Sequence, residues 1–278
     1  MLPAMLFWRP DGTRLRNLDP MRRMLPMLMP TRNEAVVYYE QIVDATALTG
    51  FLDRWNAGDG PPLTPLHLVV ASLGRVLAAR PALDRFVAAR RLWQRKVPSV
   101  AFAAKKDFND KAPIKTVKLP IVAGETLAAT AARIRDAVGV SRTRDDRPVD
   151  KELSLLGRLP DFLLSPLIRL ARRLDRWNLL PGALIADDPL FSSVFVANLG
   201  SLGLDRAYHH LYEHGTVSLF CVIGTLEPRV LVVDGAAVVR PTLRLRFTLD
   251  ERICDGFYAA RSLELLRADL EDPSRFPA

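Results

Sequence analysis

The pattern of apolar and polar positions along the chain predicts an α/β protein. Residues 243–249 alternate in the manner of a half-buried strand and lead into an amphipathic helix that begins near Phe257. Residues 36–42 are rich in β-branched and aromatic side chains and predict another strand. Further strands are expected at 92–94, 100–104, 114–121 and 216–224, and helices at 21–29, 44–55, 66–79 and 126–138. We expect one domain over residues 1–278, whose first part is an irregular arm at 1–20 with turns at Pro3, Pro10 and Asp11-Gly12.

Residues 141–192 form a segment of a different character. A charged stretch, SRTRDDRPVDKE, is followed from Asp161 to Trp177 by apolar residues at helical spacing, and the other face of this helix carries four arginines. The helix is expected to pack on its own domain or on a neighbouring subunit. The alternative is that it lies on an anionic membrane surface, which a basic amphipathic helix of this kind can bind.

The junction between the last strand and the last helix reads DERICDG and is the strongest candidate for a functional site. Asp250, Glu251, Arg252 and Asp255 lie within six residues, together with the thiol of Cys254. A strand–helix junction holds such side chains on a rigid base. The sequence therefore predicts that reactive groups gather here.

The stretch VRPTLRLRFTLDERICDGFYAARSLELLRADLEDPSRF resembles the end of the acyltransferase (catalytic) domain of 2-oxoacid dehydrogenase complexes, the dihydrolipoamide acyltransferases. It is also similar to the chloramphenicol acetyltransferases. SSVFVANLGSLG and RPALDRF resemble two further elements of these families. The resemblance covers most of the chain from about residue 21, apart from 141–192, and implies a two-layer α/β sandwich with a mixed sheet and helices on one side.

The resemblance also implies roles for individual residues. Glu251 stands where these families have the histidine that removes a proton from a thiol or hydroxyl, and Asp255 matches an aspartate that pairs with an arginine of the amino-terminal segment, here Arg22 or Arg23. The register on Asn198 places Ala197 where the families have a serine that stabilises the oxyanion. Ser192, Ser193 and Ser201 are the candidates to replace that serine.

A glutamate is an unusual base for this chemistry. Its ordinary pKa is near 4.3, about four units below that of a thiol, so a carboxylate removes a thiol proton weakly unless burial raises its pKa. Losing one oxyanion donor costs roughly 10²–10³ in rate. With Glu251 in place of histidine and Ala197 in place of serine, the sequence predicts altered or lost family chemistry.

The segment YHHLYEHG offers a second candidate site, because it carries His209, His210 and His214 together with Glu213. One interpretation is a relocated base, His210, oriented by Glu213 as a carboxylate orients the histidine of a triad. A second is that these histidines are structural. A third is a metal site in which His209 and either His214 or Glu213 are ligands, although no fourth ligand is evident. On balance no metal is expected.

Composition narrows the possibilities further. The net charge of +8, from 39 Lys+Arg and 31 Asp+Glu, is compatible with an anionic partner, but the basic residues are dispersed and no nucleic-acid motif accompanies them. Cys221 and Cys254 lie in apolar surroundings without metal-ligand spacing, which favours a reducing compartment. With neither a signal-peptide pattern nor an apolar run long enough to span a membrane, a cytoplasmic location is expected.

These observations predict a divergent acyltransferase that acts on a thioester such as acyl-coenzyme A, with coenzyme A as a substrate. The resemblance implies a homotrimer, with each site between two subunits, which can assemble further. No lipoyl or subunit-binding domain is expected. The alternative is a non-catalytic trimeric or cage-forming scaffold that keeps the fold.

Overall fold

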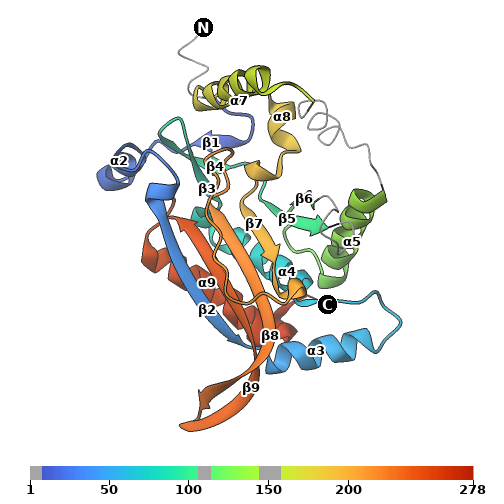
Figure 1. Ribbon diagram of the computed structural model, residues 1–278. Coiled ribbons are helices and arrows are strands. Elements are labelled where there is room, and N and C mark those ends of the chain that lie inside the picture. Colours follow the sequence, from blue (N-terminus) through green and yellow to red (C-terminus); the bar gives the residue numbers. More distant parts are fainter. Residues whose placement is uncertain (1–7, 106–113, 144–157, 278) are drawn as a thin grey trace.

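The computed structural model of the protein describes residues 8–105, 114–143 and 158–277 (Figure 1). Its strands are β1 Gly12–Arg14, β2 Val36–Asp44, β3 Arg85–Ala88, β4 Arg91–Arg95, β5 Ser99–Lys105, β6 Ile114–Pro120, β7 Val194–Asn198, β8 Leu219–Val233 and β9 Ala236–Asp250. Its helices are α2 Pro20–Leu28, α3 Thr46–Asn56, α4 Pro65–Ala79, α5 Leu127–Thr143, α7 Asp161–Arg176, α8 Gly182–Ala186 and α9 Gly256–Glu271. Most of the predicted elements are therefore present, with bounds shifted by a few residues.

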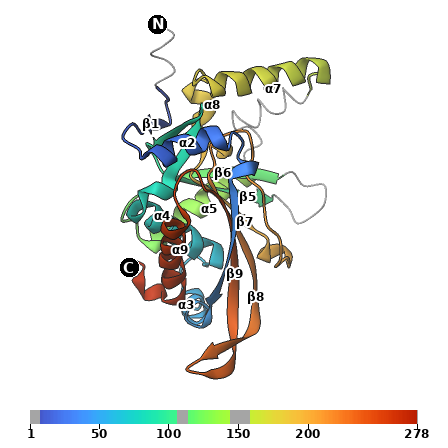
Figure 2. The same ribbon diagram turned by 90° about the vertical axis from the view of Figure 1, so that its left-hand side faces the viewer.

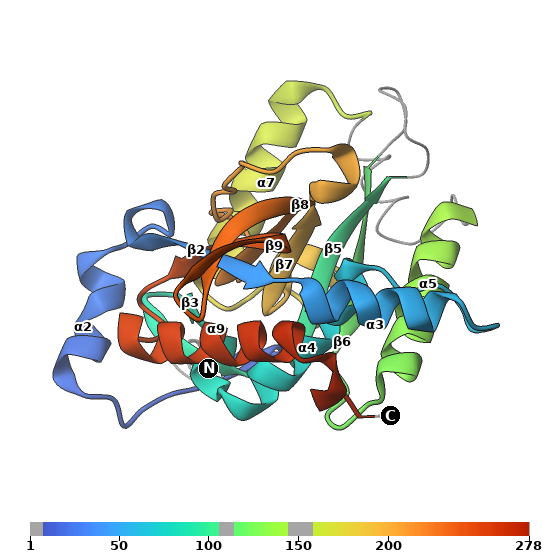
Figure 3. The same ribbon diagram turned by 90° about the horizontal axis from the view of Figure 1, so that it is seen from below.

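The main sheet has six strands in the order β2-β9-β8-β7-β5-β6 and is mixed. β7 runs parallel to both β5 and β8, whereas the remaining pairs are antiparallel. Helices α3, α4, α5 and α9 cover one face of the sheet, and in Figure 3 α4 and α9 lie below the strands. The main hydrophobic core fills the space between these helices and the alternate residues of the strands, such as Val194, Cys221 and Phe247. The predicted two-layer sandwich with helices on one side is confirmed.

The opposite face of the main sheet, here called the open face, is not covered by such a helix layer in the described part of the chain. Its residues alternate with the core residues and include Phe195, Phe220, Val222 and Thr248. The segment 199–217 crosses this face, and Leu211 packs against the sheet. The ring of His209 in this segment is thereby held against Phe220 of β8.

The predicted irregular arm at 1–20 is wrong in part. β1 lies within it and pairs with β4, which forms a three-stranded sheet in the order β1-β4-β3 beside the main sheet. Gly12, expected as a turn residue, is needed for packing instead, since a Cβ there would lie 2.6 Å from the ring of buried Phe86. Arg9 is also buried and binds Asp11 and Asp175 at 2.8 and 2.9 Å. Through the ion pair of Arg9 with Asp175, the arm is therefore bound to the helix of the 141–192 segment.

The hairpin of β8 and β9 extends well beyond the sheet, as Figure 2 shows. Its turn, Asp234-Gly235, has φ values of 50° and 81°, as a tight turn of the primed type requires. Val230, Val232 and Val239 on the projecting part are 65%, 79% and 68% exposed. An apolar projection of this kind is typical of a surface that contacts another molecule.

The helix predicted from Asp161 to Trp177 is present as α7, but it does not pack on its own domain along its length. None of its residues is buried, and only Ala171 and Leu174 contact the small cluster formed by Leu180, Ile185 and Phe191. The rest of the helix extends away from the body of the molecule (Figure 2). The charged stretch before it falls partly on residues 144–157, which lie outside the described residues. Within the described ranges no helix is long and apolar enough to cross a membrane.

Candidate active site

The turn between β9 and α9 is held by a buried ion pair. The Asp250 carboxylate, fully buried, accepts hydrogen bonds from the Arg252 backbone N at 3.1 Å and from Nε and Nη2 of the Arg252 guanidinium, both at 2.7 Å. Nη1 of Arg252 donates to the carbonyl oxygen of Met29 at 2.7 Å. A buried pair of charges is tolerable only when its remaining donors and acceptors are satisfied, as they are here. Asp250 and Arg252, the first and third residues of the DER sequence, therefore hold the turn in place.

Glu251 lies between these two residues and is held by its backbone rather than by its side chain. Its N–H donates to the Ala35 carbonyl at 2.9 Å, and its carbonyl accepts from Arg22 Nη1 at 3.0 Å. Within the described ranges the half-buried carboxylate of Glu251 has no hydrogen-bond partner. The geometry gives this carboxylate no residue that would orient it as a base.

Asp255 forms the predicted pair with the amino-terminal segment. One carboxylate oxygen caps α9 by accepting from the Tyr258 N–H at 2.7 Å, and the other lies 3.8 Å from Nη2 of Arg22. Since Asp255 is 65% exposed, the pair contributes little to stability. Its role is to fix the start of α9 and the position of α2.

The second family position lies at the end of β7. Ala197 faces the open face, beside Val222 of β8, and its side chain offers no hydrogen-bond donor. Asn198 closes the turn that follows, because its carboxamide oxygen accepts from the Ser201 N–H at 3.3 Å. Gly200 is required here, since a Cβ would lie 2.0 Å from the carbonyl oxygen of Gly224.

The three serines considered as replacements for an oxyanion donor are engaged elsewhere. The Ser192 hydroxyl donates to the Pro189 carbonyl at 2.8 Å, and the Ser201 hydroxyl donates to the Asn198 carbonyl at the same distance. Ser193 is buried, and its hydroxyl oxygen accepts from the Ser99 N–H at 2.9 Å. The expectation that one of them substitutes for the missing donor is not supported.

Glu251 and Ala197 are far apart within one chain. Ala197 aligns with Val222 on β8, and Val222 aligns with Arg246 on β9, five residues before Glu251. At about 3.3 Å per residue along a strand and about 4.8 Å between strands, the two positions are separated by roughly 15–20 Å. One copy of the chain therefore cannot bring them to the same substrate atoms.

His209 and His210 lie over the open face, between these two positions. The ring of His209 stacks on Phe220 at a centroid distance of 3.9 Å, and Thr248 donates from its hydroxyl to the His209 carbonyl. His210 stacks on His209 at 4.9 Å and meets the Tyr212 ring edge-on at 5.1 Å. The segment is thus anchored to β8 and β9 by ring stacking and by one hydrogen bond.

The backbone fixes the tautomers of these two rings. Nδ1 of His209 lies 2.7 Å from the His210 carbonyl oxygen, and Nδ1 of His210 lies 3.0 Å from the Leu211 carbonyl oxygen. Because a carbonyl oxygen can only accept, Nδ1 carries the proton in both rings and Nε2 is left as an acceptor. Burial lowers the pKa of His209, which keeps this ring neutral at pH 7.

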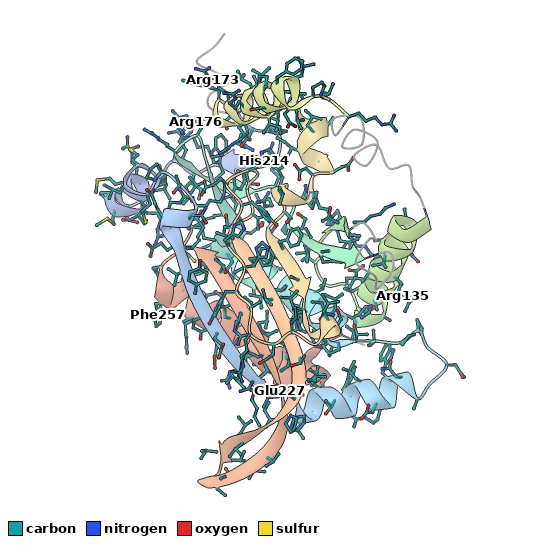
Figure 4. All side chains as sticks on the ribbon, in the orientation of Figure 1. Arg135, Arg173, Arg176, His214, Glu227 and Phe257 are labelled. Carbon is teal, nitrogen blue, oxygen red and sulfur yellow. The ribbon has the colours of Figure 1, made fainter. Side chains whose placement is uncertain are left out.

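Two of the alternatives for the YHHLYEHG segment, an imidazole oriented by Glu213 and a metal site, are not supported. Glu213 does not orient an imidazole, because its carboxylate accepts from the N–H groups of Arg32 and Asn33 at 3.3 and 3.0 Å. His214, labelled in Figure 4, lies 3.4 Å from the Asp188 carboxylate and meets the Phe191 ring edge-on. The proposed metal ligands therefore do not converge, and the described part of the chain holds no group of three His, Cys, Asp or Glu side chains arranged for a metal ion.

Two buried arginines on the open face were not predicted. Arg244 donates to Asp205 at 2.6 Å, and Arg246 donates to Glu40 at 2.8 Å and lies over the Tyr208 ring at 5.3 Å. The signal for them was the alternation in LRLRF, in which the arginines occupy the face opposite to the core leucines. These pairs tie the 199–217 segment to β2 and β9.

Both cysteines are buried thiols, as expected. Burial raises the pKa of Cys221 well above its ordinary value and that of Cys254 to about 12. His67 is structural, since its Nδ1 accepts from the Thr64 N–H at 3.1 Å in the cap of α4. These three residues have no part in the candidate site.

Comparisons with known proteins agree with this architecture. Residues 182–277 match the family model of the 2-oxoacid dehydrogenases acyltransferase (catalytic domain). None of the curated proteins compared matches the chain. The predicted resemblance is therefore confirmed by the family model over the carboxyl-terminal part, which includes Asn198, the histidine-rich segment and the Asp250–Gly256 turn.

Solved structures extend the likeness to nearly the whole chain. The dihydrolipoamide acetyltransferase of Azotobacter vinelandii, in which a serine, a histidine and an asparagine were investigated for their role in catalysis, has a TM-score of 0.61 at 18% identity, over 94% of this chain and 93% of that one. The cubic core of the pyruvate dehydrogenase multienzyme complex has a TM-score of 0.60 at 17% identity, over 94% of this chain and 93% of that one. A chloramphenicol acetyltransferase has a TM-score of 0.55 at 11% identity, over 94% of this chain and 98% of that one. At these identities the likeness shows the fold, and the predicted fold class is confirmed.

Proposed function

We propose that this protein is an acyltransferase that acts on a thioester such as acyl-coenzyme A and uses His210 as its general base. Nε2 of His210 takes the proton of the acceptor thiol or hydroxyl as the sulfur or oxygen attacks the thioester carbonyl. The tetrahedral intermediate then collapses, the coenzyme A thiolate leaves, and the proton returns to it from Nε2. The acyl group ends on the acceptor and coenzyme A is released as the thiol.

The tautomer of His210 is the observation that carries this proposal. Its Nδ1–H is bound to the Leu211 carbonyl at 3.0 Å, so its ring presents Nε2 as an acceptor from an exposed position on the open face. Imidazoles are the usual general bases of enzymes because their ordinary pKa lies close to neutral pH. The Glu251 carboxylate, in contrast, has no partner among the described residues that would orient it. His209, stacked beneath His210, acts as a positioning residue.

Turnover is expected to be slow. Ala197 provides no oxyanion donor and the neighbouring serines are bound to backbone groups. The loss of one such donor lowers the rate by roughly 10²–10³. The chemistry of the family is thus altered at two positions on a fold that is retained.

We further propose that the protein forms a homotrimer with sites between its subunits. The separation of Glu251 from Ala197 within one chain supports a site shared by two copies. β2 is an edge strand of the main sheet and exposes Tyr38 and Ile42 at 52% and 39%, and α2 exposes Met21 and Met27 at 58% and 56%. Apolar side chains on an edge strand and a projecting helix favour association. The two free, buried thiols are consistent with the reducing cytoplasm.

The alternative is a non-catalytic scaffold of the same fold, which is favoured by one observation. Ala197 and Glu251 both lack the group that the resemblance places there, whereas the structural pairs Asp250–Arg252 and Arg22–Asp255 are kept. A protein selected only to assemble would show this pattern. Such a scaffold would bind no thioester, and substitution of its histidines would leave its assembly unchanged.

The test is the release of coenzyme A from acetyl- and longer acyl-coenzyme A in the presence of a panel of thiols. His210→Gln is expected to lower kcat/KM by about 10²–10⁴. His214→Gln is the matched control, because His214 belongs to the same segment but binds Asp188. If the wild type neither turns over nor binds any thioester by calorimetry, the scaffold alternative is correct.

A further inference from the structure

A groove rich in arginine lies between α2, the chain that follows β1 and the turn between β3 and β4, on the side of α2 in Figure 1. Its volume is about 810 Å³, and six of its twelve lining residues are arginines. They are Arg14, Arg16, Arg22, Arg23, Arg90 and Arg91. The other six are Leu15, Leu18, Pro26, Met27, Ala89 and Leu92. The lining thus combines strong positive charge with apolar surface and contains no acidic residue.

The arginines repel one another in this groove. The pKa of Arg14 is lowered, first by partial burial and then by the positive charges of Arg91, Arg16 and Arg23. Two carboxylates near α2 do not line the groove. Asp19 caps the helix by accepting from the Arg22 N–H at 3.0 Å, and Asp255 lies 3.8 Å from the Arg22 guanidinium. Folding therefore gathers like charges at a place where an anion would relieve the repulsion.

The turn that carries two of these arginines has an unusual backbone. Ala89 and Arg90 have φ values of 50° and 57°, in the left-handed region that glycine and asparagine normally occupy in a two-residue hairpin. The Trp93 indole N–H donates to the Ala88 carbonyl at 3.0 Å beside the turn. Backbone outliers held by their surroundings occur most often at functional sites. Here the outlier places Arg90 and Arg91 consecutively on the wall of the groove.

We infer that this groove binds a small ligand with two or more phosphate groups. The planar guanidinium of arginine binds phosphate oxygens in pairs, so several arginines around one space suit a polyphosphate better than a single carboxylate. The volume lies within the range of small-molecule sites and exceeds the size of one phosphate ion. Leu18 and Met27, which also line the groove, provide an apolar surface for the organic part of the ligand. This inference does not depend on the proposed acyl transfer.

The experiment measures binding by calorimetry at low ionic strength with inorganic pyrophosphate, ADP and coenzyme A as probes. Vesicles of phosphatidylcholine with and without phosphatidic acid form a separate arm, which distinguishes a soluble phosphate from a lipid headgroup. Arg90→Asn removes one charge and keeps a residue that adopts positive φ readily, so the fold is preserved. It is expected to weaken binding about tenfold, because each charge-assisted contact contributes about that factor. Arg23→Gln, an exposed position on α2, is expected to do the same.

The matched control is Arg54→Gln on α3, which removes the same charge from an exposed site outside the groove and should leave binding unchanged. Unfolding curves of all three variants check that each remains folded. If no probe binds, or if Arg54→Gln weakens binding as much as Arg90→Asn, the inference is wrong. Binding only to vesicles with phosphatidic acid would identify a lipid headgroup as the source of the phosphate. Loss of activity in His210→Gln with unchanged pyrophosphate binding would separate this site from the proposed reaction.

Discussion

Substitution of Arg252 by methionine should strongly destabilise the protein, because it leaves the Asp250 carboxylate buried without its partner. Asp250 is 0% and Arg252 2% exposed, and three donors of Arg252 reach the carboxylate at 3.1, 2.7 and 2.7 Å. Removal of one partner from a buried pair typically costs about 3–5 kcal/mol. The contact between Arg252 Nη1 and the Met29 carbonyl, which holds the end of α2, is lost as well.

The assay is urea and thermal unfolding followed by circular dichroism. With an unfolding entropy of about 2.1 cal/mol/K per residue, 3–5 kcal/mol in a chain of this length lowers Tm by roughly 5–9 °C. The matched control is Arg267→Met on α9. Arg267 is 39% exposed and pairs with Glu264 and Glu271, so its loss should cost at most about 1 kcal/mol.

A double variant distinguishes the lost pair from lost packing. Asp250→Asn combined with Arg252→Met removes the buried charge and should recover part of the stability, because the unpaired carboxylate dominates the penalty. If the free energy of unfolding of Arg252→Met lies within about 1 kcal/mol of that of Arg267→Met, the Asp250–Arg252 pair does not fix the Glu251 turn.

Three further results are expected. Cys221 and Cys254 should resist a thiol reagent at pH 8 and react fully in denaturant, because burial raises both pKa values; rapid labelling of the native protein would contradict their placement. Leu167→Asp should reduce the co-sedimentation of the protein with anionic vesicles at low salt, since α7 exposes Leu167 at 41% opposite its arginines, among them Arg173 and Arg176 (Figure 4); failure of the wild type to bind such vesicles would dismiss a membrane role for α7. Burial raises the pKa of Asp84 from 3.8 to about 6, so the folded state binds its proton more tightly and the contribution of this group to stability falls as pH rises from about 4 to about 6. Asp84→Asn should remove that pH dependence, and urea unfolding of both proteins between pH 4 and pH 7 measures it.

Much of the architecture could be predicted from the sequence because local patterns and packing agree. The alternation in β9, the Asp234-Gly235 turn and the apolar face of α4 each specify one element without reference to the rest of the chain. β1 could not be predicted, because three residues have no period and its pairing with β4 depends on tertiary contacts such as Gly12 against Phe86. The helix α7 was predicted from its spacing, but the sequence alone did not show that its apolar face is left exposed.

The candidate site, like the fold, could be predicted from the sequence only in part. The turn at Asp250–Gly256 and the pair of Asp255 with Arg22 were expected from the motif. The roles of the histidines were not resolved, because the partners of Glu213 and His214 lie on chain segments that only the fold brings together. Likewise, the separation of Glu251 from Ala197 follows from the strand register and not from either motif.

We propose that the base of the reaction is His210 and not the carboxylate at position 251. The most direct measurement compares kcat/KM of Glu251→Gln and His210→Gln with the wild type in one thioester assay. Since the Glu251 side chain has no partner within the described ranges, Glu251→Gln is predicted to retain activity within about threefold while His210→Gln loses about 10²–10⁴. A loss of 10² or more in Glu251→Gln, with His210→Gln near the wild type, would contradict the account.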